Sequence, residues 1–420
     1  MMKRRSKLPG LRIQPEMVQR LGRFGALPRQ PDETDGHNSP IRAQTLSYEG
    51  GGLVTTCATD GEVFVMTSLP VKGNQQPFAV TINRTMLSKV GTVAAQGGSF
   101  ELRPVRDCVA LVQGQRYLAI PSRESFPAFP APIVTGEAVA CDAKWLGSAL
   151  GFAISGGASG GNPNDEIDSR RLACSIFADG TAMGARNGVN FSVRGPAFGF
   201  DVSLRRDHAA RLWRFLSLVI QAEKSSTTTR IRHWIEIAKA AVDDREVYRF
   251  RHPSSRHILI LPSRKTPFLR RALDGLNKKS LTFGVTVEQT PLLKAVGFLQ
   301  NFGRRLTVRY PHEDSREPAL GLSVNDAATH ARDAVPSTLI EHAQPLQLPV
   351  EFTVSAADFA LALRPFRGKT VRINLRSGGH ASVTASTDPN TTFTPVGAET
   401  FFRASAVEPV IGPVDGWSAT

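Results

Sequence analysis

The arrangement of apolar and polar residues changes from one periodicity to another six times along the chain. Each time, a short run with an apolar residue at every second position leads into a segment whose apolar residues recur every three or four positions. The first pattern is typical of a half-buried strand and the second of an amphipathic helix. The changes occur at residues 11–21, 78–90, 139–150, 200–204, 285–299 and 352–364.

The recurrence of this pattern predicts an internally repeated fold. Successive changes are separated by roughly 60 residues, a spacing typical of structural repeats. Runs with alternating apolar residues fill the spaces between them. We therefore expect an α+β structure of six strand–helix–strand-meander repeats, which is a scaffold and not a fold built around a single active site.

Two linkers group the six repeats into three pairs. A proline-rich segment at 125–132 predicts an extended joint, and a second joint is expected at 265–272, before polar, turn-prone residues at 274–279. The segment 221–240 is predicted to be a helical insertion in the second pair. The predicted organisation is a basic arm at 1–10, domains at 11–132, 133–273 and 282–398, and a C-terminal tail at 399–420.

The composition is that of an ordinary globular protein. With 420 residues the chain exceeds the length at which one hydrophobic core stops growing, which favours several domains. It has neither an apolar run long enough to span a membrane nor a recognisable signal peptide, so a soluble, cytoplasmic protein is expected. The four cysteines lie far apart, without the paired spacing of a zinc site. We expect reduced, packed thiols, no metal and no cofactor.

The net charge of +14 points to a polyanionic partner. Nucleic acid is the commonest such partner inside cells, and it binds basic proteins through release of counterions. Cations recur on the predicted helices, where they can line a common DNA-binding surface. The alternative is that they only solvate the outer faces of the helices. The candidates are Arg20, Arg23, Arg84, Lys89, Lys144, Arg205, Arg206, Arg211, Arg214, Lys294, Arg364 and Arg367.

Several segments, in order along the chain, resemble the bacterial beta sliding clamp, the processivity subunit of DNA polymerase III. Residues 53–61 are similar to a clamp strand that ends in Ala-Thr-Asp-Gly, and residues 114–127 to its Gly-x-x-x-Phe strand and Phe-Pro linker. The Pro-Phe-Leu-Arg-Arg-Ala segment at 267–272 resembles the family's Pro-Asp-Tyr-Arg-Arg-Val. Further similar segments are 171–177, 185–191 and 391–396.

The resemblance implies a ring around duplex DNA. Beta clamps have three similar domains per chain, and two chains close head to tail as a homodimer. Their basic helices face the phosphates without reading the bases. The resemblance also implies that DNA polymerase and the clamp loader bind through short peptide motifs. Because the family catalyses no reaction, we expect no enzyme activity and no catalytic residue.

The family binds these peptides in a pocket between its second and third domains. The pocket departs here from the family pattern, because Arg186, Val189 and Asn190 replace Thr, His and Arg, and Val396 with Gly397 replaces the final Met-Arg. We therefore expect an altered or weakened peptide preference. Carried over by position, the pocket comprises Leu172, Arg186, Gly188, Val189, Asn190, Phe191, Pro267, Arg271, Ala272, Pro395 and Val396.

Ring closure in the family joins an aromatic residue on an outer strand of the first domain to apolar residues on a helix of the third. Tyr117 is the best match to the first, and Phe298 with Leu299 to the second. Packing in the core explains each of them equally well, since aromatic and leucine residues at such spacings are mostly interior.

Two other functions fit parts of the sequence. The divergent pocket and the basic excess suit a clamp-fold DNA-binding protein that is specialised, for example on a mobile element, with altered partners or no ring closure. Residues 157–161, Gly-Ala-Ser-Gly-Gly, look like the nucleophile loop of a serine hydrolase, with His37 and either Asp60 or Asp107 upstream of Ser159. This glycine-rich run reads more simply as a flexible connector.

Overall fold

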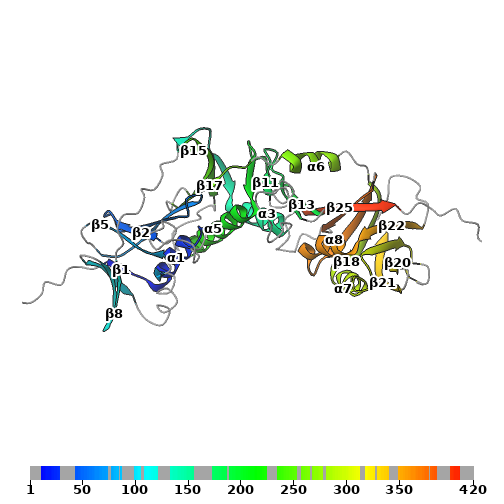
Figure 1. The fold of residues 1–420 in the computed structure, drawn as a ribbon, viewed down its shortest axis with the longest axis horizontal. Coiled ribbons are helices and arrows are strands. Elements are labelled where there is room, and N and C mark those ends of the chain that lie inside the picture. Colours follow the sequence, from blue (N-terminus) through cyan, green and yellow to red (C-terminus); the bar gives the residue numbers. More distant parts are fainter. Residues whose placement is uncertain are drawn as a thin grey trace, which may run out of the picture. The chain divides into compact units, whose positions relative to one another are not determined.

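The elements of the chain are drawn in Figure 1 from a computed structural model. At all six changes of periodicity a strand leads into helical residues, as predicted. The chain divides into two compact units, each described separately below: unit 1 is residues 1–147 with 207–265, and unit 2 is residues 148–206 with 266–420. The structure describes residues 11–28, 43–73, 77–84, 86–87, 99–105, 108–121, 133–155, 173–186, 189–224, 234–252, 257–264, 267–277, 281–312, 317–326, 329–339, 349–377, 379–385 and 398–406.

Unit 1 contains two antiparallel sheets. The smaller has the order β1 (Leu11–Ile13), β6 (Phe100–Val105), β7 (Cys108–Gln113), β8 (Arg116–Pro121). The nine-stranded sheet has the order β10 (Val139–Asp142), β15 (Trp234–Val242), β16 (Arg245–His252), β17 (His257–Pro262), β4 (Phe64–Pro70), β3 (Leu53–Thr59), β2 (Ala43–Tyr48), β5 (Phe78–Asn83), with β9 (Ile133–Val134) also paired to β15. Its helices are α1 (Pro15–Gly25), the start of α3 (Ala143–Ser155) and nearly all of α5 (Arg206–Lys224).

Unit 2 contains one twelve-stranded sheet. Its order is β14 (Val202–Arg205), β11 (Ala173–Ile176), β12 (Ala182–Arg186), β13 (Val189–Val193), β25 (Ala398–Ala406), β22 (Val350–Ser355), β19 (Arg305–Tyr310), β20 (Ala319–Asp326), β21 (Thr329–Leu339), β18 (Leu281–Glu288), β23 (Thr370–Arg376), β24 (His380–Ala385). It also contains α3 from residue 148 onward, α6 (Pro267–Asn277), α7 (Gln289–Leu299), α8 (Ala356–Leu363) and the short 3-10 helix η2 (Arg364–Phe366).

Each large sheet continues across a predicted domain boundary. In unit 1, β17 of the predicted second domain pairs antiparallel with β4 of the first. In unit 2, β13 of the predicted second domain pairs antiparallel with β25. The strands of the predicted second domain are therefore shared between the two units, which is why the compact units do not coincide with the three strand–helix pairs.

Helix α1 illustrates how the periodic segments fold. It begins with Pro15, which is tolerated at this position because the first N–H groups of a helix have no partner within the helix. Val18, Leu21 and Phe24 are buried and form one apolar stripe at spacings of three residues. This stripe packs toward the sheet residues of unit 1, so the polar side of α1 is left at the surface.

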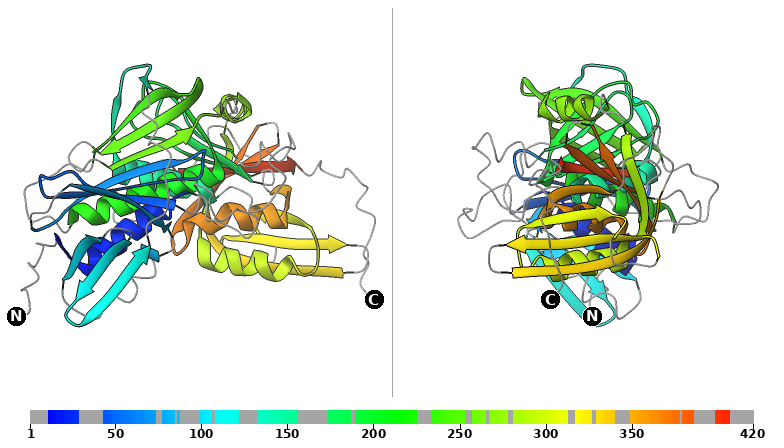
Figure 2. Two further views of the ribbon diagram at one scale, coloured as in Figure 1. Left: turned by 60° about the vertical axis from the view of Figure 1, so that its left-hand side comes forward. Right: turned by 90° about the vertical axis from the view of Figure 1, so that its right-hand side faces the viewer.

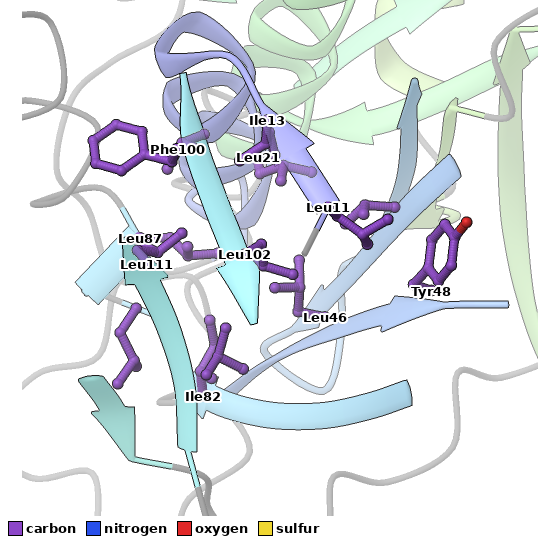
Figure 3. Packing of buried hydrophobic residues seen from close by; sticks show 14 of the residues in the cluster. Leu11, Ile13, Leu21, Leu46, Tyr48, Ile82, Leu87, Phe100, Leu102 and Leu111 are labelled. Atoms are coloured by element: carbon purple, nitrogen blue, oxygen red, sulfur yellow. The ribbon is translucent and has the colours of Figure 1, made fainter. Parts of the chain in front are cut away.

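The core of unit 1 lies where the two sheets and α1 meet. Leu11 and Leu102 from the small sheet pack near Leu46 and Ile82 from the nine-stranded sheet, with Leu21 from α1 (Figure 3). Residues far apart in the sequence thus form one cluster. Burial of each such side chain contributes about 1.5–3 kcal/mol to folding.

In unit 2, helices α7 and α8 pack against each other (Figure 2). The Ser355 hydroxyl accepts the N–H of Asp358 at 3.3 Å and so caps the start of α8. Gln289 at the start of α7 is buried, and its side-chain amide donates to the carbonyl of Leu363 at 3.1 Å and accepts the N–H of Gly368 at 3.2 Å. These bonds fix the start of one helix to the end of the other.

Two predicted segments differ from the structure. The helical insertion predicted at 221–240 is wrong in its described parts, because residues 221–224 complete α5 and residues 234–242 form strand β15. Residues 225–233 lie outside the described residues. Residues 398–406 form β25, which lies inside the twelve-stranded sheet and is not part of a terminal tail. Phe401 and Phe402 are both buried although they are neighbours, because this strand is covered on both faces. Such a strand lacks the alternation by which strands are recognised in sequence.

The four cysteines are free, as predicted. Burial raises the pKa of both Cys141 and Cys174 to about 12, so these thiols stay protonated and unreactive at neutral pH. Among the described residues, no group of three or more His, Cys, Asp or Glu side chains is placed to hold a metal ion. None of the described helices is long and apolar enough to cross a membrane.

Candidate nucleic-acid interface and partner surfaces

Helices α1 and α5 cover the same region of the nine-stranded sheet in unit 1 (Figure 2). The ring of Phe24 on α1 meets the ring of Phe215 on α5 edge-on at 6.0 Å and stacks on His257 of β17 at 4.8 Å. In β15, which β16 separates from β17, Ile235 and Ile237 are buried while the alternating Glu236 is partly exposed. One face of the sheet is thus covered by helices. The other, which we call the helix-free face, carries polar side chains such as Glu236 and Arg251 together with a small buried apolar cluster of Ala240, Val247 and Ile260.

The polar sides of α1, α3 and α5 carry several of the predicted DNA contacts. Arg23 on α1, Lys144 in the first turn of α3 and Arg214 on α5 are exposed, and Arg20 is partly exposed. These cations are available to a polyanion. Lys89 lies outside the described residues.

Arg84 and Arg211 have structural roles that the sequence pattern does not reveal. Arg84 is buried, and its guanidinium donates to the carbonyl of Pro28 at 3.2 Å. The Arg211 side chain is 15% exposed and forms an ion pair with Asp60, whose side chain is 4% exposed. Both were candidate DNA contacts, and both are instead held inside unit 1.

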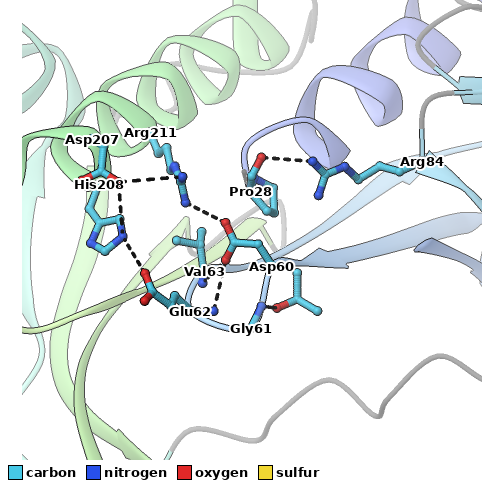
Figure 4. A network of polar contacts seen from close by, with 10 residues as sticks. Pro28, Asp60, Gly61, Glu62, Val63, Arg84, Asp207, His208 and Arg211 are labelled. Atoms are coloured by element: carbon cyan, nitrogen blue, oxygen red, sulfur yellow. Dashed lines mark hydrogen bonds and ion pairs between the residues drawn. The ribbon is translucent and has the colours of Figure 1, made fainter. Parts of the chain in front are cut away.

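The Asp60–Arg211 pair explains the Ala-Thr-Asp-Gly motif. Asp60 accepts the N–H groups of Glu62 at 3.1 Å and Val63 at 2.7 Å, while Gly61 takes a positive φ of 90° in the turn between β3 and β4. The Arg211 guanidinium donates to its other oxygen at 2.8 Å (Figure 4). The motif therefore ties the β3–β4 turn to α5, an element about 150 residues away in sequence.

A buried histidine extends this network. His208 on α5 is almost fully buried, and its Nε2 lies 3.5 Å from a carboxylate oxygen of Glu62 and 3.8 Å from one of Asp207. Asp207 also lies 3.8 Å from Arg211. The start of α5 is thus joined to the turn by a group of charged and polar side chains (Figure 4).

A second buried histidine predicts a pH effect on stability. Burial, and next the charges of His252 and Arg20, lower the pKa of His257 to about 3. In the unfolded chain the pKa returns to about 6.5, so between these values the unfolded state binds more protons and the folded state is destabilised as pH falls. We expect a loss of up to about 1.4 kcal/mol of unfolding free energy per pH unit below pH 6.5. Urea unfolding at several pH values measures it.

The variant His257→Gln is expected to flatten this dependence, because it removes the group that must charge on unfolding. His380→Gln is the matched control, since His380 is partly exposed. An unchanged slope in His257→Gln contradicts the assignment.

In unit 2 the predicted cations are distributed over several elements. Lys294 on α7 is exposed, as are Arg364 in η2 and Arg367 just after it. Arg205 and Arg206 are partly exposed, and Arg206 donates through Nε to the carbonyl of Ile154 at 3.3 Å. None of these five is sequestered as Arg84 is.

The predicted peptide pocket is only partly accessible in unit 2. Val189 and Phe191 are fully buried, and the ring of Phe191 meets that of Phe152 edge-on at 6.0 Å, so these side chains belong to the core. Because side chains alternate along β13, Asn190 points to the other face. It is partly exposed and lies opposite Phe401 in β25.

The remaining pocket residues lie on or beside other elements. Arg271 is exposed on α6, and Ala272 packs against a small buried cluster. Arg186 ends β12 and Pro267 begins α6. The other four, which lie outside the described residues, are Leu172, Gly188, Pro395 and Val396.

Helix α6 is anchored by residues that the sequence comparison did not single out. Leu269 is fully buried with Phe177, Met183 and Phe401, and Arg270 lies over the ring of Phe177 at 5.0 Å. The spacing of Leu269 and Ala272 is the amphipathic signal that predicts this docking.

Arg270 also forms ion pairs with Asp179 at 3.1 Å and Asp274 at 3.5 Å. Burial alone would raise the pKa of Asp179, but hydrogen bonds from Thr181 and the positive charge of Arg270 lower it below its ordinary value. The charge network therefore holds α6 beside the turn that joins β11 to β12.

The residues predicted for ring closure fall into two classes. Tyr117 on β8 is 61% exposed and Phe298 on α7 is 51% exposed, where it meets the ring of Phe302 edge-on at 5.0 Å. Leu299 is fully buried and belongs to the core of unit 2, so its side chain is not available to a partner. On a helix, neighbouring residues point about 100° apart, and only one of these two can face outward.

The residues proposed for a hydrolase are not assembled in the described part of the chain. Ser159, His37 and Asp107 lie outside the described residues. Asp60, the remaining candidate, is already bonded to Arg211 and to two backbone N–H groups.

Comparisons with known proteins give one consistent result. No family model matches the sequence, and no curated protein matches it. Solved structures do match: the pol III beta of Caulobacter crescentus has a TM-score of 0.68 at 14% identity, covering 94% of this chain and 100% of the other. This chain has the sliding-clamp fold. The beta subunit of DNA polymerase III from Thermotoga maritima has a TM-score of 0.69 at 11% identity, covering 95% of this chain and 100% of that one.

A third match extends the likeness to another bacterium. The Helicobacter pylori beta clamp in complex with carprofen has a TM-score of 0.67 at 12% identity and covers 94% of this chain and 100% of the other. Such low identity is that of a divergent sequence on a shared three-domain clamp fold. The α+β class and the repeated strand–helix architecture predicted from the sequence are confirmed.

Proposed function

We propose that the protein is a DNA sliding clamp: two copies close head to tail around duplex DNA and hold a polymerase or another partner on it. The observation that carries this proposal is the way in which strands join the repeats within one chain. The last strand of the second strand–helix pair, β17, adds to β4 of the first, and β25 of the third adds to β13 of the second.

The same pairing, applied to all three strand–helix pairs, leaves one strand of the first pair and one strand of the third pair without a partner from the next pair. By position in the repeat, β8 corresponds to β17 and β25, and β21 corresponds to β4 and β13. Among the described residues, β8 pairs only with β7. Strand β21 lies between β20 and β18. It pairs with β20 along residues 329–336 but with β18 only along residues 337–339, so most of its edge on the β18 side is open. Open strand edges of this kind attract another strand.

Closure between two chains would use both open edges. Antiparallel pairing of β8 of one copy with the open part of β21 of the other repeats the two joints found within the chain. Exposed apolar groups flank both strands: Tyr117 and Leu118 lie on β8, and Phe298 lies on α7, which packs against β21. A head-to-tail contact of this kind gives a ring when its rotation closes.

Binding to DNA would rest on the exposed cations of the helices. Arg23, Lys144 and Arg214 in unit 1 suit contacts with phosphates, which are independent of sequence and permit sliding. The net charge of +14 favours the same partner. For partner peptides, we propose docking beside α6, where Asn190 and Arg271 are accessible.

A topological experiment tests the ring. The protein is threaded onto linear duplex DNA, both ends are then blocked with bulky groups, and a high-salt wash follows. A ring is expected to survive the wash and to leave when the DNA is cut, whereas a surface binder is removed by salt alone. If blocked and open DNA lose the protein at the same rate in the wash, the proposal fails.

The charge contribution is tested by salt titration. Replacing Arg23, Lys144 and Arg214 together by Ala is expected to reduce the slope of log affinity against log salt by about 2 to 3, because each phosphate contact contributes about 0.9. The matched control replaces Arg245, Arg249 and Arg251, which alternate along β16 on the helix-free face. Equal changes in the two triple variants contradict the assignment of the interface to the helices.

A further inference from the structure

Trp213 on α5 is a large aromatic side chain exposed among cations. It is 43% exposed. Arg214, the next residue, is exposed. Arg206, seven residues earlier on the same side of the helix, is partly exposed and donates through Nε to the carbonyl of Ile154. An indole exposed to this extent next to arginine residues is accessible to a flat, negatively charged ligand.

The residues around Trp213 on its own helix leave the ring open. Ala210 and Ser217, three positions before and four after, flank it on the same side, and both are small. The Ser217 hydroxyl donates to the backbone carbonyl of Trp213 at 3.0 Å, so it is directed at the backbone and not over the ring. A flat group can therefore approach the indole.

The chemistry of this surface favours one ligand. Phosphate contacts need only the arginines, and in duplex DNA the faces of the bases are covered by their neighbours. An aromatic ring beside cations is the arrangement by which proteins bind single strands, because every unpaired base has an exposed π-face. The cations hold the backbone while the ring takes the base.

We propose that Trp213 stacks on an unpaired DNA base, so that α5 binds a single-stranded segment as well as duplex DNA. The inference rests on the proposed function for bringing DNA to the helices of unit 1. It adds a preference: DNA with a single-stranded extension binds more tightly than blunt duplex of equal length.

Trp234 supplies a matched control. It is 37% exposed, belongs to the same unit, and begins β15 on the face that alternates with the buried Ile235 and Ile237. That is the helix-free face. Trp213 and Trp234 thus match in residue type and exposure and differ in the surface they occupy.

The experiment measures fluorescence anisotropy of a labelled oligothymidylate and of a blunt duplex of equal length at fixed salt. Trp213→Ala is expected to weaken single-strand binding about tenfold, since stacking contributes about 1–3 kcal/mol per base, and to weaken duplex binding less than about twofold. Trp213→Phe, which keeps a ring, is expected to retain most of the single-strand affinity. Trp234→Ala is expected to match the wild type.

Three results overturn the proposal: unchanged single-strand binding in Trp213→Ala, equal losses for single strand and duplex, or an equal loss in Trp234→Ala. Melting temperatures of the variants separate a binding loss from misfolding, and Trp213→Phe provides the second test if Trp213→Ala unfolds. The ring is assessed independently by end-blocked DNA. If single-strand binding depends on Trp213 but the protein is not retained on end-blocked DNA, the stacking contact is supported and the ring is refuted. If the protein is retained but single-strand binding does not depend on Trp213, the ring is supported and the stacking contact is refuted.

Discussion

Asp60→Asn is expected to destabilise unit 1 by about 3 kcal/mol, the largest effect on folding that we predict. The substitution leaves Arg211 largely buried without its nearest counter-charge and with only the more exposed Asp207, at 3.8 Å, to compensate it. Removal of one partner from a buried ion pair typically costs about 3–5 kcal/mol. We expect a loss at the lower end of this range because the Arg211 side chain is 15% exposed and therefore partly hydrated. The amide keeps an oxygen for the N–H groups of Glu62 and Val63, so the turn itself is little disturbed. Calorimetric unfolding of the wild type and the variant measures the difference.

A double-mutant cycle isolates the pair. The double variant Asp60→Asn with Arg211→Met is expected to lose less stability than the sum of the two single changes, because the second substitution removes a charge that has already lost its nearest partner. Glu236→Gln is the control. Its partner Arg251 lies 4.0 Å away on the helix-free face, with both side chains more than a third exposed, so a change below about 1 kcal/mol is expected. Additive losses at Asp60 and Arg211 would refute the coupling.

Phe298→Asp is expected to separate the proposed dimer into monomers, with a dissociation constant raised at least a hundredfold. A central aromatic residue in an interface contributes about 2–4 kcal/mol, and an aspartate at that place must also be desolvated. Every 1.4 kcal/mol is a factor of ten in affinity. Sedimentation velocity over a range of concentrations measures the change, and Tyr117→Asp is expected to act in the same direction.

The control is Trp234→Asp, an exposed aromatic replaced by the same charge on the helix-free face of unit 1. It is expected to leave the dimer intact. A wild-type protein that sediments as a monomer at every concentration refutes ring closure, and retention of Phe298→Asp on end-blocked DNA would show that Phe298 is not part of the joint.

The strand–helix transitions were predictable because periodicity is a local property. A segment such as β5 or β10 carries its alternation in six residues or fewer, and the helix after it begins at once. β25 was missed for a physical reason: Phe401 and Phe402 face opposite sides, and both sides are covered. The sequence of β15 also predicts a helix although Ile235 and Ile237 alternate, because Ile231, Trp234 and Ile235 recur at the spacing of a helical face.

The site was less predictable than the fold because exposure depends on partners far away in sequence. Arg211 and Arg214 are three residues apart on one helix, yet the first is paired with Asp60 and the second is free to face solvent. Only the β3–β4 turn, which the sequence places about 150 residues earlier, distinguishes them. In the same way Val189 and Phe191 are buried while Asn190 between them is accessible.

The strand joints have a kinetic consequence. The β17–β4 and β25–β13 pairings join segments of one polypeptide, so a tether keeps their effective concentration high and a broken pair re-forms without dilution. In the proposed ring, no polypeptide link spans either of the two joints between copies, so each is held by its own contacts, and while one is open the other still connects the copies. Opening is therefore expected at these joints, and the fraction of the protein assembled into rings depends on protein concentration, because loss of both joints releases monomers. A loader that opens the ring has to separate one strand pair, while the rest of each chain stays folded.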